Sequence, residues 1–139
     1  MYCQLKSSGK KIIIIAGGTP TFPIHARRKE IECSPGTFIY WDTGYGNLLK
    51  VQPYNYAALV LTRVISKPSP GMLCLDLGHK AIASENPLHN RVTFINAPEL
   101  EPVGQSEEHL VVKTNNWENY QVGQLIYGVP FHICPTVAL

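Results

Sequence analysis

Glycine and proline recur along the whole chain and leave only short apolar runs between them. The sequence has eleven of each among its 139 residues, and both residue types end helices and strands or occupy turns. Short runs separated by turn residues are typical of antiparallel β-proteins. Hydrophobic residues make up 45% of the chain and charged residues 16%, which is enough apolar material for a globular core. We therefore predict a mainly β fold, an antiparallel β-barrel or sandwich.

Five of six predicted strands carry the β-branched and aromatic residues that favour strands, and the sixth, Met72–Leu75, is expected as a hairpin partner. The sequence Ser69-Pro70-Gly71 predicts a turn that joins two of them as a hairpin. Residues 20–35 are expected to form a loop, and residues 98–108 at most one helical turn. The predicted strands are Thr37–Trp41, Ala57–Ser66, Met72–Leu75, Arg91–Ile95, His109–Lys113 and Leu125–Ile133.

The run Ile12–Ala16 differs from these segments because five consecutive apolar residues precede Gly17 and Gly18. A short continuous apolar run fits a strand buried on both faces, as in a parallel sheet. Nothing upstream offers a parallel partner, so we expect one orphan strand. The two glycines would let backbone N–H groups approach a phosphate closely, and Thr19 adds a hydroxyl donor. An ordinary strand-ending turn is the alternative interpretation.

Net charge, apolar run length and cysteine spacing indicate which partners and which cellular compartment to expect. The formal net charge is +2, and the basic cluster Arg27–Lys29 has no interleaved aromatic residues, so we expect no nucleic-acid partner. No apolar run approaches the roughly 20 residues of a membrane span, so no membrane is expected. The opening residues lack the features of a signal peptide. The four cysteines are widely spaced, which favours reduced thiols and a cytoplasmic protein.

His132 and Cys134 form the strongest local candidate for a metal site. If the last predicted strand continues to Cys134, the two side chains point to one face, with Cα atoms about 6.5 Å apart. An imidazole nitrogen and a thiolate could then reach a single zinc ion at about 2.0–2.3 Å. A histidine and a cysteine on a core face would give the same spacing. The spacing alone therefore leaves both interpretations open.

Two other clusters carry ionisable side chains. Asp76, His79 and Lys80 lie within five residues, and a lysine can form a Schiff base, but packing and hydrogen bonding explain the same residue types. Glu108 and His109 are adjacent, so on a strand they would face opposite ways unless the strand is bulged. We expect structural or near-site roles for Asp76, His79 and Lys80 rather than primary catalysis. For Glu108 and His109 a solvated charge is the favoured interpretation, and an outer partner of a site is the alternative.

Six segments taken in order resemble the C-terminal region of one enzyme family. They are IIAGGTPTFPIHA, ECSPGTFIYWDTGYG, ALVLTRVISKP, LDLGHKAIASENP, SEEHLVV and YGVPFHICPTVAL. Together they resemble the D-serine dehydratase / D-threonine aldolase family of fold-type III pyridoxal-phosphate enzymes, most closely its dehydratase-like branch. The resemblance runs from about Ile12 to the last residue.

The resemblance implies a two-part organisation. An N-terminal α/β barrel of the family holds pyridoxal phosphate as a Schiff base, and a β-domain closes over it. Residues 1–31 would then be the tail end of the barrel, with Ile12–Ala16 as its last strand. Residues 32–139 would be the β-domain that carries the metal motif. The Schiff-base lysine belongs to the missing barrel, so the catalytic residue stays unassigned in this chain.

The resemblance also implies site residues and chemistry. Gly17, Gly18 and Thr19 would touch the cofactor phosphate, while His132 and Cys134 match the metal ligands. A thiolate favours zinc over the alternative, manganese. We expect a lyase acting on a small D-3-hydroxyamino acid, with D-serine converted to pyruvate and ammonia. Alternatives are retro-aldol cleavage of the D-threonine type or a non-catalytic β-domain that serves dimerisation. The full-length enzyme would be a homodimer, and this chain alone would be inactive.

Overall fold

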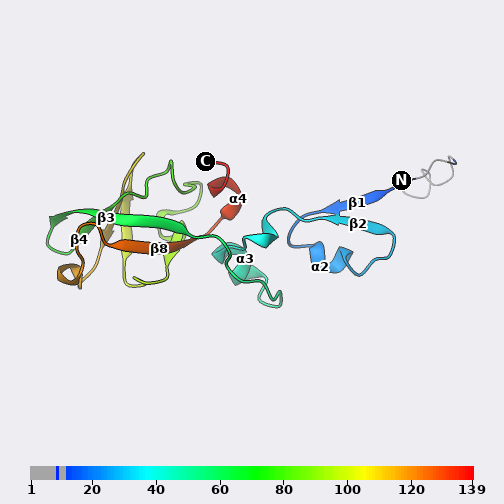
Figure 1. The fold of residues 1–139 in the computed structure, drawn as a ribbon, viewed down its shortest axis with the longest axis horizontal. Helices are drawn as coiled ribbons and strands as arrows, with labels where there is room; N and C mark the ends of the chain where they lie inside the picture. Colours follow the sequence, from blue (N-terminus) through cyan, green and yellow to red (C-terminus); the bar gives the residue numbers. More distant parts are fainter. Residues whose placement is uncertain (1–8, 10–11) are drawn as a thin grey trace. The chain divides into compact units, whose positions relative to one another are not determined.

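The computed structural model describes residue 9 and residues 12–139. The chain divides into two compact units, residues 1–39 and residues 40–139. Both are built mainly from strands with short helices between them (Figure 1), so the predicted mainly β class is confirmed. The sequence placed a boundary between residues 31 and 32, which falls inside strand β2 (Ile31–Ser34). The two compact units divide between Ile39 and Tyr40, and the boundary between a barrel end and a β-domain stays a prediction.

The first unit is a two-stranded parallel sheet with one short helix. Strand β1 (Ile14–Gly17) pairs in parallel with β2, and helix α2 (Phe22–His25) lies in their connection. β1 is therefore not an orphan strand, and the expectation of a continuous loop over residues 20–35 was wrong. Ile13 and Ile15 are 59% and 63% exposed. Within this unit the run is thus half exposed rather than buried on both faces.

Residues 37–41 do not form the predicted strand. Thr37–Ile39 is a 3-10 turn, η1, and Trp41 has a positive φ of 56°. The Trp41 side chain is only 3% exposed. It stacks on Tyr45 with ring centroids 5.5 Å apart and meets Tyr54 edge-on at 5.0 Å. Burial of the indole among these rings offsets the cost of the left-handed backbone, so packing overrides the strand preference of the segment.

The second unit is a six-stranded antiparallel sheet that curls into a half-barrel (Figure 1). The spatial order of its strands is β5-β8-β3-β4-β7-β6. β3 pairs with β8 along its first half and with β4 along its second half, where the register shifts twice. Such irregularities bend a strand, and they allow the long strand β3 to pair with both β8 and β4 within the curled sheet. The strands are β3 (Val60–Ser69), β4 (Met72–Leu75), β5 (Val92–Phe94), β6 (Glu101–Gln105), β7 (Leu110–Lys113) and β8 (Leu125–Pro130).

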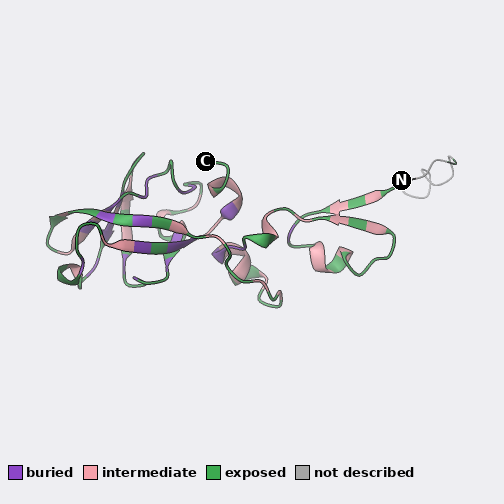
Figure 2. Cartoon of the chain, in the orientation of Figure 1, coloured by how far each residue is buried: buried purple, intermediate pink, exposed green. Residues whose placement is uncertain are grey.

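The core lies against the inner face of this curled sheet. Buried and exposed residues alternate along the strands (Figure 2), as expected where one face of a sheet is covered. Gly71 has a φ of 78° at the predicted hairpin turn, where glycine is favoured. The core cluster consists of Val64, Leu73, Leu75, Leu77, Ile82, Val92, Phe94, Ala97, Leu100, Leu110, Val112, Tyr120 and Ile126.

Two elements of this unit differ from the prediction. β6 occupies the segment where one helical turn was expected. β8 ends at Pro130, and Ile133–Thr136 forms a short helix, α4, with His132 as its N-cap. Pro135 lies in the first turn of α4, where the missing N–H costs nothing. The remaining short helices are α3 (Thr43–Leu48), η2 (Leu88–Asn90) and η3 (Trp117–Asn119).

Within the described part of the chain, no helix has both the length and the apolar character that crossing a membrane requires.

Candidate metal and cofactor site

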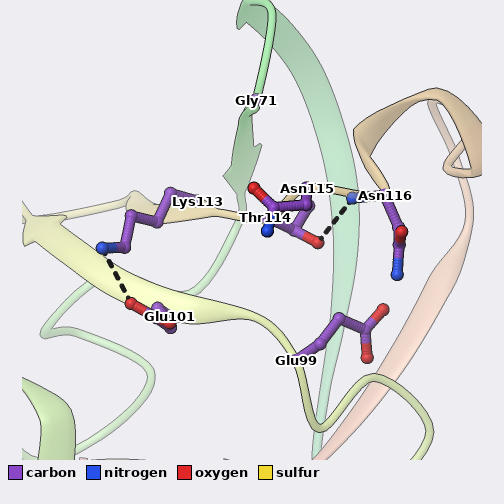
Figure 3. A pocket seen from close by; sticks show the side chains of 7 residues that line it. All are labelled: Gly71, Glu99, Glu101, Lys113, Thr114, Asn115 and Asn116. Carbon is purple, nitrogen blue, oxygen red and sulfur yellow. Dashed lines mark hydrogen bonds and ion pairs between the residues drawn. The ribbon is translucent and has the colours of Figure 1, made fainter.

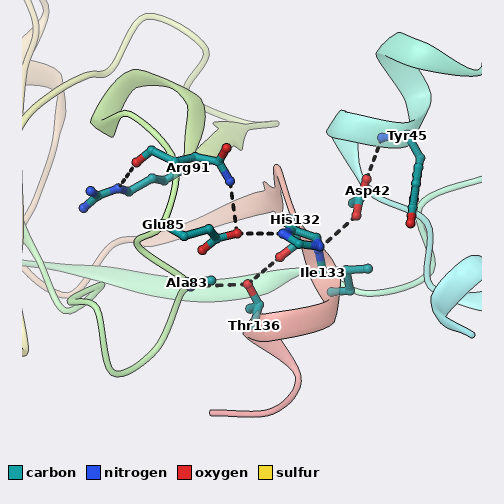
Figure 4. Close-up of polar contacts among 9 residues, drawn as sticks. Asp42, Tyr45, Ala83, Glu85, Arg91, His132, Ile133 and Thr136 are labelled. Atoms are coloured by element: carbon teal, nitrogen blue, oxygen red, sulfur yellow. Dashed lines mark hydrogen bonds and ion pairs between the residues drawn. The ribbon is translucent and has the colours of Figure 1, made fainter.

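His132 follows the end of β8 and is held by a carboxylate from a distant loop. Its Nδ1 lies 2.7 Å from Oε1 of Glu85 (Figure 4). Each of the two side chains is 43% exposed. A carboxylate can only accept, so Nδ1 is the donor in this contact, and in a neutral ring the lone pair then lies on Nε2. Histidines that bind metals usually donate their second ring N–H in this way.

The backbone beside His132 is fixed by a buried aspartate. Asp42 is 1% exposed. Its Oδ2 accepts from the backbone N–H of Ile133 at 2.9 Å, and its Oδ1 accepts from that of Tyr45 at 2.7 Å (Figure 4). Asp42 therefore caps the N-terminus of α3 and satisfies the first N–H of α4 at once. The Asp42 carboxylate thereby fixes the backbone directly after His132.

A second link joins the turn at His132 to the loop that carries Glu85. The hydroxyl of Thr136 donates to the backbone oxygen of His132 at 2.9 Å and accepts from the N–H of Ala83 at 3.3 Å (Figure 4). Ile82 and Ala83 are buried, so this loop is anchored in the core. Glu85 thus approaches His132 from a fixed backbone.

The structure corrects the argument that placed His132 and Cys134 on one face of a strand. His132 is extended, with φ −132° and ψ 104°, whereas Cys134 lies in the first turn of α4. The alternation of strand side chains therefore does not apply to this pair, and their metal-binding role stays a prediction. Among the described residues, no group of three or more His, Cys, Asp or Glu side chains could hold a metal ion.

The donor set nevertheless fits a zinc ion. An imidazole with its Nε2 lone pair available and a cysteine sulfur two positions later are both ligands that zinc prefers. The Glu85 carboxylate supplies the outer contact that orients a ligating histidine. The described cysteines are thiols rather than disulfides. His132 and Cys134 are therefore the residues that would hold a zinc ion, and this role stays a prediction.

The predicted phosphate loop follows β1 in the first unit. Gly18 has a φ of 96°, and Gly17 and Gly18 are exposed while Thr19 is only 4% exposed. The hydroxyl of Thr21 donates to the backbone oxygen of Gly17 at 3.1 Å, which closes the turn. The backbone of Gly17 and Gly18, which is exposed, lacks Cβ atoms and turns at Gly18, fits the approach of a phosphate group.

The other ionisable clusters serve the framework. Asp76 accepts from the hydroxyl of Thr62 at 2.7 Å and from the N–H of Arg63 at 2.6 Å. Lys80 pairs with Glu107 and Glu108 at the surface, and these two carboxylates raise its pKa. These contacts of Asp76 and Lys80 connect neighbouring strands and loops, and none of them involves His132.

The sequence analysis missed two carboxylates near the site: Glu85, which contacts His132, and Asp42, which accepts from the next residue, Ile133. Asp42 directly precedes Thr43 at the start of α3, which is an N-cap signature that could have been read from the sequence. Glu85 had no such signal, because it is 47 residues from His132 in the chain. Only the fold brings this pair together.

A polar pocket of about 490 Å³ lies elsewhere on the second unit (Figure 3). Its described lining contains none of the residues predicted for the metal or the phosphate. An ion pair between Lys113 and Glu101 at 2.9 Å crosses part of it. The lining residues are Gly71, Glu99, Glu101, Lys113, Thr114, Asn115 and Asn116.

The second unit is a curled β-domain in which Glu85 contacts His132 just before the first turn of α4. Residues 57–139 match the family described as "Putative serine dehydratase domain". The chain belongs to this family, and the resemblance seen in the sequence is confirmed. Comparison with curated proteins gave no match.

Solved structures share the fold. The chain superposes on D-threonine aldolase from Filomicrobium marinum with a TM-score of 0.79 and 23% identity, covering 96% of this chain and 37% of that one. A D-threo-3-hydroxyaspartate dehydratase in which a histidine is replaced by alanine gives a TM-score of 0.72 and 19% identity, covering 95% and 39%. The same dehydratase with a cysteine replaced, in a metal-free form, gives 0.67 and 18%, covering 95% and 40%. The chain thus spans about two fifths of the length of these proteins.

Proposed function

We propose that this chain forms the metal-bearing part of a pyridoxal-phosphate-dependent lyase that dehydrates D-serine to pyruvate and ammonia. The family match over residues 57–139 supports a serine dehydratase domain. The fold shared with a D-threonine aldolase and a D-threo-3-hydroxyaspartate dehydratase supports chemistry on D-3-hydroxyamino acids. A small D-amino acid would be the substrate, and the full-length enzyme would act as a homodimer.

The observation that carries the proposal is the oriented imidazole of His132. Its Nδ1 is engaged by Glu85 at 2.7 Å, and Cys134 follows two positions later. In the dehydratase structures, the replaced histidine and the replaced cysteine are also two positions apart, and the cysteine variant is described as metal-free. The same spacing supports the assignment of His132 and Cys134 as metal ligands.

The residues of this chain would divide the work as follows. Gly17, Gly18 and Thr19 would bind the cofactor phosphate through backbone N–H groups and a hydroxyl. Pyridoxal phosphate, when bound, supplies an electron sink for the α-carbon of the amino acid. His132 and Cys134 would hold a zinc ion, or manganese as the alternative, which supplies a Lewis acid for the β-hydroxyl. Glu85 would keep the His132 proton on Nδ1.

Retro-aldol cleavage of a D-threonine-like substrate is the second candidate. It is favoured by the TM-score of 0.79 to D-threonine aldolase. The same ligands would then assist loss of the proton from the β-hydroxyl, and the Cα–Cβ bond would break. A β-domain that serves only dimerisation is the non-catalytic alternative, and it predicts no metal at His132.

The experiment uses a full-length family member with alanine at the positions that match His132 and Cys134. A chelator should abolish pyruvate formation from D-serine, and zinc should restore it. Because a Lewis acid contributes several kcal/mol, each substitution should lower the rate about 100-fold or more, whereas alanine at the position of the exposed His89 should not. Full activity in both variants would refute the metal role.

Product analysis in the same assay separates the two reactions. Glycine and an aldehyde formed from D-threonine would favour the aldolase, and pyruvate from D-serine the dehydratase. The 139-residue chain by itself should give neither product, because it spans only 37% of the aldolase chain.

A further inference from the structure

We propose that Glu85 is the positioning residue for the metal centre: it fixes the Nδ1–H tautomer of His132 and so presents Nε2 to the ion. The inference rests on the proposed function, since it assigns the orientation of a ligand at that same site. No sequence motif pointed to Glu85. Its contact with His132 at 2.7 Å carries the inference.

The Glu85 carboxylate is itself held in place. Its Oε1 accepts both from His132 Nδ1 and from the side-chain amide of Asn86, the latter at 3.0 Å. Arg91 Nε donates to the backbone oxygen of Asn86 at 2.8 Å, and the guanidinium also contacts Gln105. The loop end that carries Glu85 is therefore tied to β6.

The other end of this loop is tied to α4. Ala83 donates to the hydroxyl of Thr136, which donates to the backbone oxygen of His132. Through Thr136, the loop segment just before Glu85 is therefore also linked to the backbone of His132. With both backbones fixed, the 2.7 Å contact between the two side chains sets the orientation of the ring.

An ordinary surface ion pair is the competing explanation, and it makes a different prediction. Both side chains are 43% exposed, and pairs of this kind contribute little to folding stability. If that were the whole role of Glu85, its loss would change neither the tautomer nor the metal affinity. A positioning role predicts the reverse, because removal of a carboxylate behind a ligating histidine typically weakens metal binding 10–100-fold.

The test compares the wild-type chain with Glu85→Ala, Glu85→Gln and Glu101→Gln. Glu101 is the matched control, since it also forms an exposed ion pair, with Lys113. Zinc affinity is measured by competition with a chromophoric chelator, the His132 tautomer by ¹⁵N NMR of the metal-free chain, and stability by thermal unfolding.

We expect His132 to be the Nδ1–H tautomer in wild type and a mixture in Glu85→Ala. Zinc affinity should fall about 10–100-fold in Glu85→Ala, less in Glu85→Gln, and not at all in Glu101→Gln, while the melting temperatures of all four stay close. Wild-type affinity and an unchanged tautomer in Glu85→Ala would overturn the inference. A wild-type chain that binds no zinc would instead refute the proposed function.

Discussion

At the scale of single residues, Asp42 has the most direct consequence for the site. Its carboxylate is 1% exposed and accepts from the N–H groups of Tyr45 and Ile133. Hydrogen bonds to a charged group contribute about 1.5–3 kcal/mol each, and unsatisfied buried partners are costly. Asp42→Ala should therefore lower the free energy of unfolding by about 3 kcal/mol, measured by urea denaturation. Glu118→Ala, an exposed acidic control, should change it little. Equal stability of the two variants would contradict the capping role.

Tyr120 gives a prediction about alkaline pH. Burial raises the pKa of its hydroxyl above the ordinary value, and the hydrogen bond to Glu99 raises it further. Because the folded-state pKa is raised, the contribution to stability is complete below the unfolded value of about 10 and is lost as pH rises above it.

The measurement is the free energy of unfolding of wild type and Tyr120→Phe between about pH 8 and pH 11, a range chosen around the ordinary tyrosine pKa. Wild type should be more stable near pH 8, and the difference should narrow above about pH 10. Tyr127→Phe serves as the control, since Tyr127 is 41% exposed. A difference between wild type and Tyr120→Phe that stays constant with pH would refute the assignment.

At the scale of elements, Gly78 allows the loop after β4 to pack closely against the loop between β6 and β7. A Cβ at this position would lie 2.1 Å from the backbone oxygen of Glu107, and the next residues donate to Ser106 and Glu107. Gly78→Ala should therefore destabilise the fold by about 1–3 kcal/mol, the usual cost of overpacking. Gly104→Ala is the matched control, because its Cβ would meet nothing within 4 Å. The melting temperatures of the two variants are compared by thermal unfolding. Equal melting temperatures would show that the two loops can move apart without loss of stability.

The elements also show how far the sequence could lead. Met72–Leu75 was predicted with its observed bounds, because the turn Ser69-Pro70-Gly71 directly precedes a short apolar run. β2, which pairs with β1, was missed because only Ile31 among its four residues is a strand former. Ile133 is a β-former by type, yet it starts α4, where the Asp42 carboxylate accepts from the N–H of Ile133. The His132–Cys134 spacing was visible in the sequence, whereas no local pattern could reveal Glu85.

At the scale of the whole molecule, the curled sheet brings distant segments to His132. His132 directly precedes α4, shortly after the end of β8. Glu85 lies in the connection between β4 and β5, and Asp42 is the N-cap of α3. All three lie in the unit of residues 40–139. The predicted phosphate loop belongs to the other unit. The second unit can therefore be examined for metal binding through its own residues.

The most direct test of the central claim is X-ray absorption of the zinc-loaded chain at the zinc edge. The account predicts one sulfur ligand at about 2.3 Å and nitrogen at about 2.0–2.1 Å. Cys134→Ser should remove the sulfur signal and His132→Ala should weaken zinc binding, whereas Cys74→Ser should leave the spectrum unchanged. A zinc site without sulfur, or a sulfur signal that survives Cys134→Ser, would contradict the assignment of His132 and Cys134 as the metal ligands.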